Sequence, residues 1–223
     1  MGDQVPIGRQ ALRLEGTWTL AEFAELCKTY EQIYNTLFLL NPSLQTAFDE
    51  LQLERLEYIY RAFPWKGGYS AVNFYNSQAY LIPTPLRPAV RRISFESPGM
   101  MELGIVVVAA ASVRRIVKSI TASGSDVNGL YHDIYKGMHE RRLMKIDAKR
   151  QELALARDQL EFADEAQERL AKAIGFNESS SIKELAGNPV AALKITLSLF
   201  RRARDLSEVE QKGRLDIDQP SDQ

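Results

Sequence analysis

A run from Asp126 to about Ile174 constrains the fold most, because it contains no proline and only two glycines, Gly129 and Gly137. Its apolar residues recur at nearly the straight-helix spacing, which predicts an amphipathic helix or a helical hairpin rather than a strict heptad coiled coil. A continuous helix of about 50 residues would be roughly 75 Å long, too long for one core of a chain this size to bury. We therefore expect its apolar stripe to form an oligomer interface, made by Leu130, Ile134, Met138, Leu155, Phe162 and Leu170.

The N-terminal part of the chain is predicted to begin with a strand and to continue as helices. Residues 9–15 alternate weakly between apolar and polar side chains, which is typical of a strand. Thr19 and Glu22 then match a capping box, which predicts the start of a helix that Asn41-Pro42 ends. A second helical pattern follows over residues 44–63.

The middle of the chain is predicted as a loop, a strand and a helix. Residues 64–89 are rich in Gly, Asn, Ser and Pro, which indicates a long loop with room for a short hairpin. Val90–Glu96 is the best strand pattern in the chain. Ser97-Pro98 is typical of a helix start and predicts a helix over about 98–119, although Val and Ile at 105–108 also favour a strand there.

The C-terminal part is predicted to hold one more helix, which begins at Asn188-Pro189 by the same capping logic. The polar residues from about Gly213 onward are expected to be disordered. These elements predict a mostly helical α+β fold. Its expected segments are an α+β domain over 1–122, a helical arm with the C-terminal helix over 123–212, and a disordered tail over 213–223.

Two short motifs resemble a family of bacterial proteins to which no activity is assigned. The first is Ser97-Pro98-Gly99-x-x-Glu102 after a strand, and the second is His139-Glu140-Arg141-Arg142 at the opening of a charged helix. The resemblance covers residues 88–175 and implies a bacterial or phage-related origin. It implies no catalytic or binding residue.

No catalytic, cofactor or metal motif is expected in this sequence. Cys27 is the only cysteine, so it forms no disulfide within the chain, and this favours a cytoplasmic protein. His132 and His139 would lie about 10 Å apart on a helix, too far for one metal ion, and are expected on a solvated face. We expect no cofactor and no catalytic residue.

The segment 64–122 is the only positively charged part of the chain, with seven basic and two acidic side chains. The basic residues at the end of the predicted helix either complement the helix dipole or form, with the others, a positive patch for an acidic partner surface, a nucleotide or a membrane headgroup. Nucleic-acid binding is disfavoured because the overall net charge is −1. The candidate interaction patch consists of Arg87, Arg91, Arg92, Arg114, Arg115 and Lys118.

Three functions are compatible with these features. The favoured hypothesis is a non-enzymatic protein that associates with itself, as a homo-oligomer, and with another protein. The second is a membrane-acting effector that uses the apolar segment 100–113, which is shorter than the ~20 residues of a spanning helix. The third is an enzyme whose site forms between chains, from the basic patch and the carboxylates of the long helix.

Overall fold

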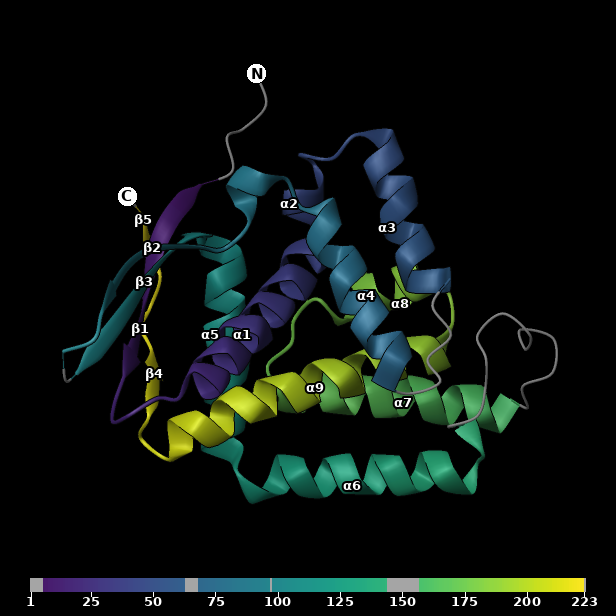
Figure 1. Cartoon of the computed structure of the whole chain (residues 1–223). Helices are drawn as coiled ribbons and strands as arrows, with labels where there is room; N and C mark the ends of the chain where they lie inside the picture. The colour runs from purple at the N-terminus through teal and green to yellow at the C-terminus, as the bar shows by residue number, and fades with distance from the viewer. Residues whose placement is uncertain (1–5, 63–67, 97, 144–156, 223) are drawn as a thin grey trace.

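The computed structural model describes residues 6–62, 68–96, 98–143 and 157–222, and confirms a mostly helical α+β fold. A small antiparallel sheet lies at one side of a group of helices (Figure 1). The strands are β1 (Ile7–Leu14), β2 (Ala89–Ser94), β3 (Gly99–Val106), β4 (Leu215–Ile217) and β5 (Ser221–Asp222). The helices are α1 (Leu20–Leu40), α2 (Pro42–Gln45), α3 (Glu50–Ala62), α4 (Gly68–Leu81), α5 (Val107–Ser123), α6 (Ser125–Glu140), α7 (Arg157–Ala173), α8 (Ser179–Ala186) and α9 (Pro189–Gln211), with a 3-10 turn at Thr84–Leu86.

The sheet joins the two ends of the chain. Its order is β2-β3-β1-β4, and β5 also pairs with β1. The side chains of β1 alternate, so that Gln10, Leu12 and Leu14 are buried while Arg9 and Arg13 are exposed. One face of the sheet therefore packs on the helices and the other carries charged side chains.

A buried polar network fixes the sheet to α1. The Tyr34 hydroxyl accepts a hydrogen bond from the Val106 N–H at 2.8 Å and donates to the Leu86 carbonyl at 2.9 Å. The Tyr30 hydroxyl donates to the Gln10 side chain in the centre of β1. Burial raises the pKa of both tyrosines well above its ordinary value, so both hydroxyls stay protonated.

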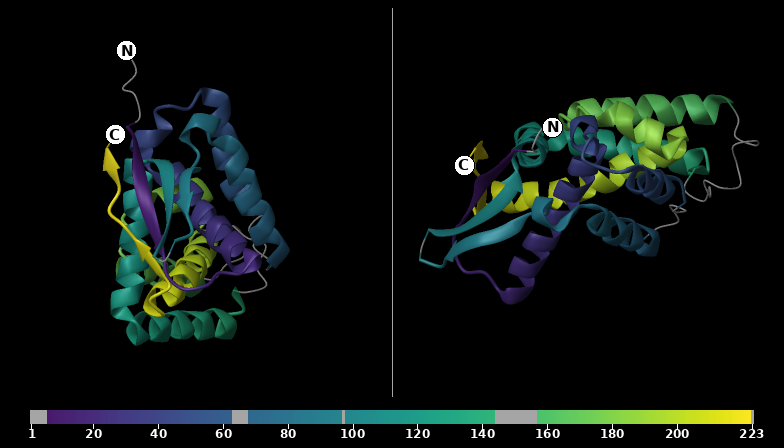
Figure 2. Two further views of the ribbon diagram at one scale, coloured as in Figure 1. Left: turned by 60° about the vertical axis from the view of Figure 1, so that its left-hand side comes forward. Right: turned by 90° about the horizontal axis from the view of Figure 1, so that it is seen from above.

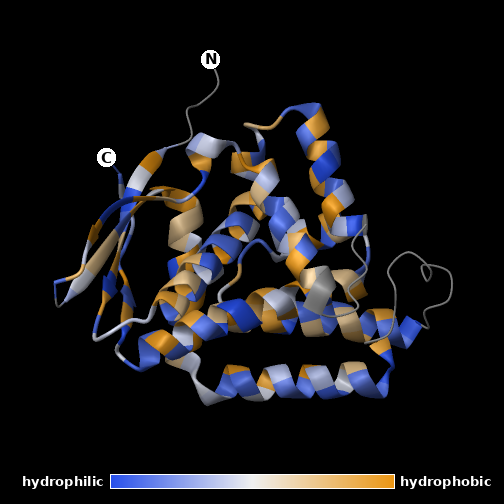
Figure 3. Ribbon diagram, viewed as in Figure 1, coloured by the Kyte–Doolittle hydropathy of each residue, from blue (hydrophilic) through white to orange (hydrophobic). Residues whose placement is uncertain are grey.

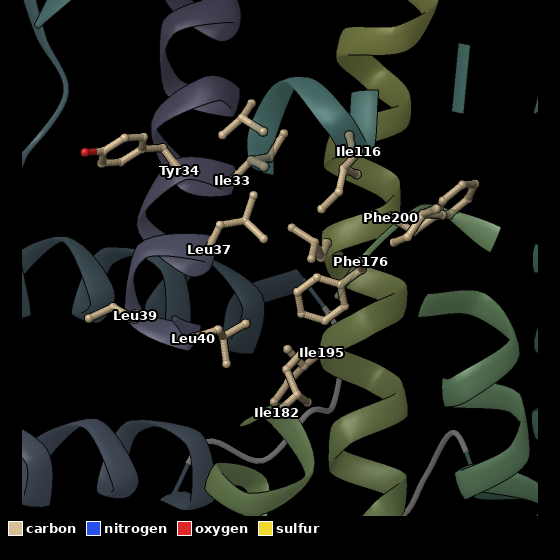
Figure 4. Close-up of a cluster of buried hydrophobic side chains, with 14 of the residues drawn as sticks. Ile33, Tyr34, Leu37, Leu39, Leu40, Ile116, Phe176, Ile182, Ile195 and Phe200 are labelled. Carbon is tan, nitrogen blue, oxygen red and sulfur yellow. The ribbon is translucent and has the colours of Figure 1, made fainter. Parts of the chain in front are cut away.

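The helical core is built around α9, which packs against α1, α5 and α7. The capping pattern predicted at its start is confirmed: the Asn188 side chain accepts from the N–H groups of Val190 and Ala191, at 2.8 and 3.3 Å. The capping box at Thr19 and Glu22 is confirmed as well. Figure 4 shows one part of this core, where side chains from α1, α5, α8 and α9 meet, among them Ile33, Leu37, Ile116, Ile182 and Ile195.

The loop predicted over 64–89 is wrong in its described part, because α4 occupies residues 68–81. Phe74 and Tyr75 of α4 are fully buried. Gln78 is buried too, where it accepts from the Thr36 hydroxyl at 2.9 Å and donates to the Tyr60 hydroxyl at 3.0 Å. Tertiary packing therefore stabilises a helix whose Gly, Asn and Ser content disfavours it locally.

The single helix predicted over 98–119 is also wrong, because β3 continues to Val106 and α5 begins at Val107. Both parts are largely buried, including Leu103 and Ile105 in β3 and Val113 in α5. The apolar segment 100–113 is therefore a core segment that crosses from strand to helix. Among the described helices, none combines the length and the apolar character needed to cross a membrane.

The disordered tail predicted over 213–223 is wrong in its described part, since β4 and β5 both pair with β1. Leu215 and Ile217 are 2% and 0% exposed and lie opposite Leu14 and Leu12 in the register. Their alternation with the exposed Asp216 is a three-residue strand pattern. Burial of these two side chains is what orders the segment.

The region 126–174 contains two helices in its described part, which agrees with the hairpin alternative. Helices α6 and α7 pack against each other (Figure 1), and α7 packs on α9. In Figure 3 the ribbon of α6 alternates between hydrophilic and hydrophobic residues, as expected for a helix with one buried face. We expected a helix too long to be buried by the core of its own chain. In the described part of this region that expectation is wrong, because α6 and α7 pack against each other and α7 packs on α9.

Candidate protein-interaction surface

The helical stripe expected as an oligomer interface lies inside the protein in its described part. Ile134, Met138 and Leu170 are 2%, 0% and 0% exposed, and Leu130 and Phe162 pack partly buried against the same core. The sixth residue of the stripe, Leu155, lies outside the described residues. The buried members pack within the chain and leave little surface for a partner.

The α6–α7 contact has a specific geometry at Gly137. A Cβ atom at this position would lie 2.5 Å from Cζ of Phe162, so glycine permits the close approach of the two helices. The Arg141 guanidinium lies 4.1 Å from the centre of the same ring. Gly137, which the sequence suggested as a weak point of a long helix, is thus a packing residue of the hairpin.

Two of the six predicted patch residues hold α5 to the C-terminal strands. The Arg114 Nε atom donates to the Ile217 carbonyl at 3.0 Å. The Lys118 ammonium lies 2.7 Å from Glu210 and 2.8 Å from Asp216. Although burial by itself lowers the pKa of Lys118, hydrogen bonds to these two carboxylates raise it above its ordinary value. These side chains are engaged within the fold.

Two more patch residues also contact their own chain. The Arg115 Nε atom donates to the Gly175 carbonyl at 3.0 Å, and its Nη2 atom lies 3.3 Å from a carboxylate oxygen of Glu178. The Arg87 Nε atom donates to the Ile82 carbonyl at 2.8 Å. Both arginines therefore satisfy backbone carbonyls of their own chain, at Gly175 after α7 and at Ile82 after α4.

The remaining pair, Arg91 and Arg92, lies on β2, and the structure does not gather all six residues into one patch. Neither side chain forms an ion pair or a hydrogen bond with any residue of the described ranges. The pairing with β3 is irregular between Val90 and Arg92, and Arg92 lies opposite Glu102. Glu102 is already paired, with Arg9 at 3.5 Å.

The apolar side chains of β2 and of the residue after it are exposed. Val90, Ile93 and Phe95 are 51%, 36% and 82% exposed. Strand β2 forms an edge of the sheet, because in the described parts of the chain it pairs only with β3. The β2–β3 hairpin extends to the side of the helices (Figure 2, right). An edge strand with exposed apolar side chains is a template for pairing with another chain.

Catalytic and metal-binding alternatives find little support in the described parts of the chain. His132 and His139 are both exposed on α6. No group of three or more His, Cys, Asp and Glu residues could hold a metal ion there. Burial raises the pKa of the Cys27 thiol, which makes it a poorer nucleophile. The edge formed by β2 is thus the better-supported candidate site.

No protein-family model, curated protein or solved structure matches the chain. The resemblance expected for residues 88–175 therefore stays a prediction. The sequence identified the strand of this site and its two arginines. It did not identify the strand as an edge, because that position depends on β3, which was predicted as part of a helix and which pairs with β2 on one side and with β1 on the other.

Proposed function

We propose that the protein is a non-enzymatic interaction protein that self-associates through β2. The observation that carries this proposal is the open β2 edge, with its exposed Phe95 and its unpaired Arg91 and Arg92. Pairing would satisfy the free main-chain groups of the edge and cover its apolar side chains. The single cysteine supports a cytoplasmic setting for this association.

The occupant we propose for the edge is the same segment of a second copy, the end of β2 together with the two residues that follow it. Residues 92–96 have the sequence RISFE. If two such segments pair antiparallel with their symmetry axis at Ser94, Arg92 lies opposite Glu96 of the second copy, and Ile93 lies opposite its Phe95. Every charged residue then meets an opposite charge, and every apolar residue meets an apolar one.

This register also places each pair on a consistent face of the sheet. Arg92 lies opposite Glu102 of β3, on the charged face, whereas Ile93 lies opposite the buried Met101, on the face toward the helices. Since side chains of a strand alternate between its two faces, Phe95 in the paired segment would lie on the same face as Ile93, and Glu96 on the same face as Arg92. The dimer would therefore continue both faces of the sheet from one subunit into the next.

The expected affinity is modest. Cross-strand pairs of opposite charge and of aromatic with β-branched residues contribute roughly 0.2–1 kcal/mol each. By symmetry the register holds two pairs of each kind, together roughly 1–4 kcal/mol, in addition to main-chain hydrogen bonds and the burial of Phe95. Association also costs free energy, because the two copies lose translational and rotational freedom. We therefore expect a dissociation constant on the order of micromolar.

Light scattering behind a sizing column tests the proposal at increasing protein concentration. The mass should rise from 25.2 kDa toward twice that value. Phe95→Asp should keep the protein at the monomer mass, because it removes an aromatic contact and adds a charge. Tyr80→Asp is the matched control, since Tyr80 and Phe95 are 83% and 82% exposed but only Phe95 lies beside β2.

A charge exchange tests the register itself. Arg92→Glu should weaken the dimer, because it places carboxylates opposite each other at both ends of the paired segment. Adding Glu96→Arg to that variant should restore the dimer, since each copy then supplies both partners in reversed order. A wild-type protein that stays monomeric would refute the proposal, as would a dimer that Phe95→Asp leaves unchanged.

A further inference from the structure

A second feature lies away from β2, between the N-terminal half of α1 and the C-terminal half of α9, which pack against each other. A pocket of about 190 Å³ opens to solvent here. Leu26, Leu206 and Val209 give it apolar walls, and Trp18 lies at its side. Thr29, Glu25 and Asp205 supply polar atoms to the same pocket.

Thr29 brings a hydroxyl group to the pocket. Thr29 is 3% exposed and lines the pocket, yet its side chain makes no hydrogen bond with any residue of the described ranges. By contrast, the hydroxyl of Thr196, also in a helix, donates to the carbonyl four residues earlier at 3.0 Å. The Thr29 hydroxyl is therefore available to bond water or a polar group that enters the pocket.

The charges around the pocket are predominantly negative. Glu22 is neutralised, because Arg214 contacts it at 2.7 Å and also donates to the Thr17 carbonyl. Glu25 has only a long, exposed ion pair with Lys28, at 3.5 Å, which contributes little. The Asp205 carboxylate forms no ion pair or hydrogen bond with any described residue. Two carboxylates at the pocket are thus without a strong cationic partner.

The two nearby arginines of α9, Arg202 and Arg204, act on Asp205 only through space, because their direct contacts are with other residues. The Arg202 Nε atom donates to the Gln32 side chain, and its guanidinium lies 3.8 Å from the ring centre of Tyr75. Arg204 pairs with Glu208 at 3.4 Å. Burial raises the pKa of the Asp205 carboxyl, and the charges of Arg204 and Arg202 offset this only in part, so its charged form would gain from a cation placed beside it.

We propose that this pocket binds a primary alkylammonium group. The ammonium would lie between Asp205 and Glu25 and donate to the Thr29 hydroxyl, while its carbon chain packs against the apolar walls. An apolar cavity of about 150 Å³ is sufficient for benzene, so the pocket accommodates a chain of about four to six carbons. Such a group occurs in free amines and in the lysine side chains of proteins.

Binding can be measured from the Trp18 indole N–H signal in ¹H–¹⁵N NMR spectra, identified through a Trp18→Phe variant. Butylammonium chloride should shift the signal saturably, whereas butanol, which has the same length and no charge, should not. A titration with Nα-acetyl-lysine methylamide distinguishes the two sources. If the lysine derivative binds at least as tightly, a protein lysine fits the site; if only butylammonium binds, the site takes a free amine.

Two variants test the assigned contacts. Asp205→Asn should weaken butylammonium binding about tenfold or more, because it removes a charged hydrogen-bond acceptor. Thr29→Val removes only the hydroxyl and should also weaken binding without unfolding the protein. Asp133→Asn, on the exposed surface of α6, is the matched control and should leave the affinity unchanged.

The proposal is overturned if butylammonium gives no saturable shift, or if butanol gives the same one. It is also overturned if Asp205→Asn and Thr29→Val both bind as the wild type does. Because none of these residues belongs to β2, the result is independent of whether the protein dimerises through that strand. The titration is repeated with Phe95→Asp, which is expected to be monomeric. The same affinity for butylammonium in this variant would show that the pocket does not depend on the dimer.

Discussion

The Ile217 side chain in β4 offers the sharpest test of how the C-terminal strands hold the fold. Ile217 is 0% exposed and lies opposite Leu12, which is also 0% exposed, at the centre of the sheet. Its carbonyl accepts the hydrogen bond from Arg114 on α5. An Ile217→Ala variant keeps that main-chain contact and removes only the buried aliphatic side chain.

The expected loss follows from this burial. Replacing a fully buried isoleucine by alanine costs about 2–5 kcal/mol of unfolding free energy, because both the transfer energy and a cavity contribute. For a chain of this length, 1 kcal/mol corresponds to a shift of about 2–4 °C in the unfolding midpoint. The midpoint of Ile217→Ala should therefore fall by about 4–20 °C.

Thermal and urea unfolding followed by circular dichroism measure this loss. Leu20→Ala is the matched control, because Leu20 is 90% exposed and its truncation should change stability by less than about 0.5 kcal/mol. If residues 215–217 were disordered, as their polar surroundings suggested, Ile217→Ala would behave like Leu20→Ala. Equal stability of the two variants would refute the packing of β4 on β1.

Two further predictions concern the helix caps. Asn188→Ala should lower the unfolding free energy by about 0.5–2 kcal/mol, because two N–H groups of α9 lose their acceptor; a urea titration that shows no change would contradict this. A hydrogen bond from Arg214 lowers the pKa of Glu22 from its ordinary value of 4.5 to about 2. The stability that Glu22 contributes is therefore complete above about pH 4.5 and is lost as the pH falls from there toward 2. Glu22→Gln should make stability less dependent on pH across this window in urea titrations, and an unchanged dependence would exclude the Glu22–Arg214 pair as its source.

The helix starts were predictable because their signals are local. Thr19 with Glu22, and Asn188 with Pro189, satisfy helix N–H groups through atoms only a few residues away. No distant contact is needed to recognise such a cap. The strand β2 was predicted for a similar reason, since the alternation of Ile93 and Phe95 with polar residues is visible in a short window.

The errors arose where distant packing determines the structure. Helix α4 depends on the burial of Phe74 and Tyr75 and on the hydrogen bonds of Gln78 with side chains of α1 and α3. The boundary between β3 and α5 falls in a continuous apolar run, in which periodicity cannot separate strand from helix. Strand β4 is only three residues long, and the sequence alone does not show that β1 is available to pair with it.

The difference between local signals and distant packing also explains why the sequence predicted an interface on the helical arm, whereas the structure favours the sheet. An apolar stripe on a helix indicates that the helix packs against something, but not whether the partner belongs to the same chain. Here α6 packs on α7, and α7 packs on α9.

The opposite holds for β2, whose exposed Val90, Ile93 and Phe95 have no covering element in the described parts of the chain. In the described sheet, β2 forms one edge because it pairs only with β3, and the short strands β4 and β5, which pair with β1, form the other edge. The C-terminal strands thus extend the sheet on one side with short, partly buried segments, whereas the exposed apolar side chains that could attract a partner lie at the β2 edge.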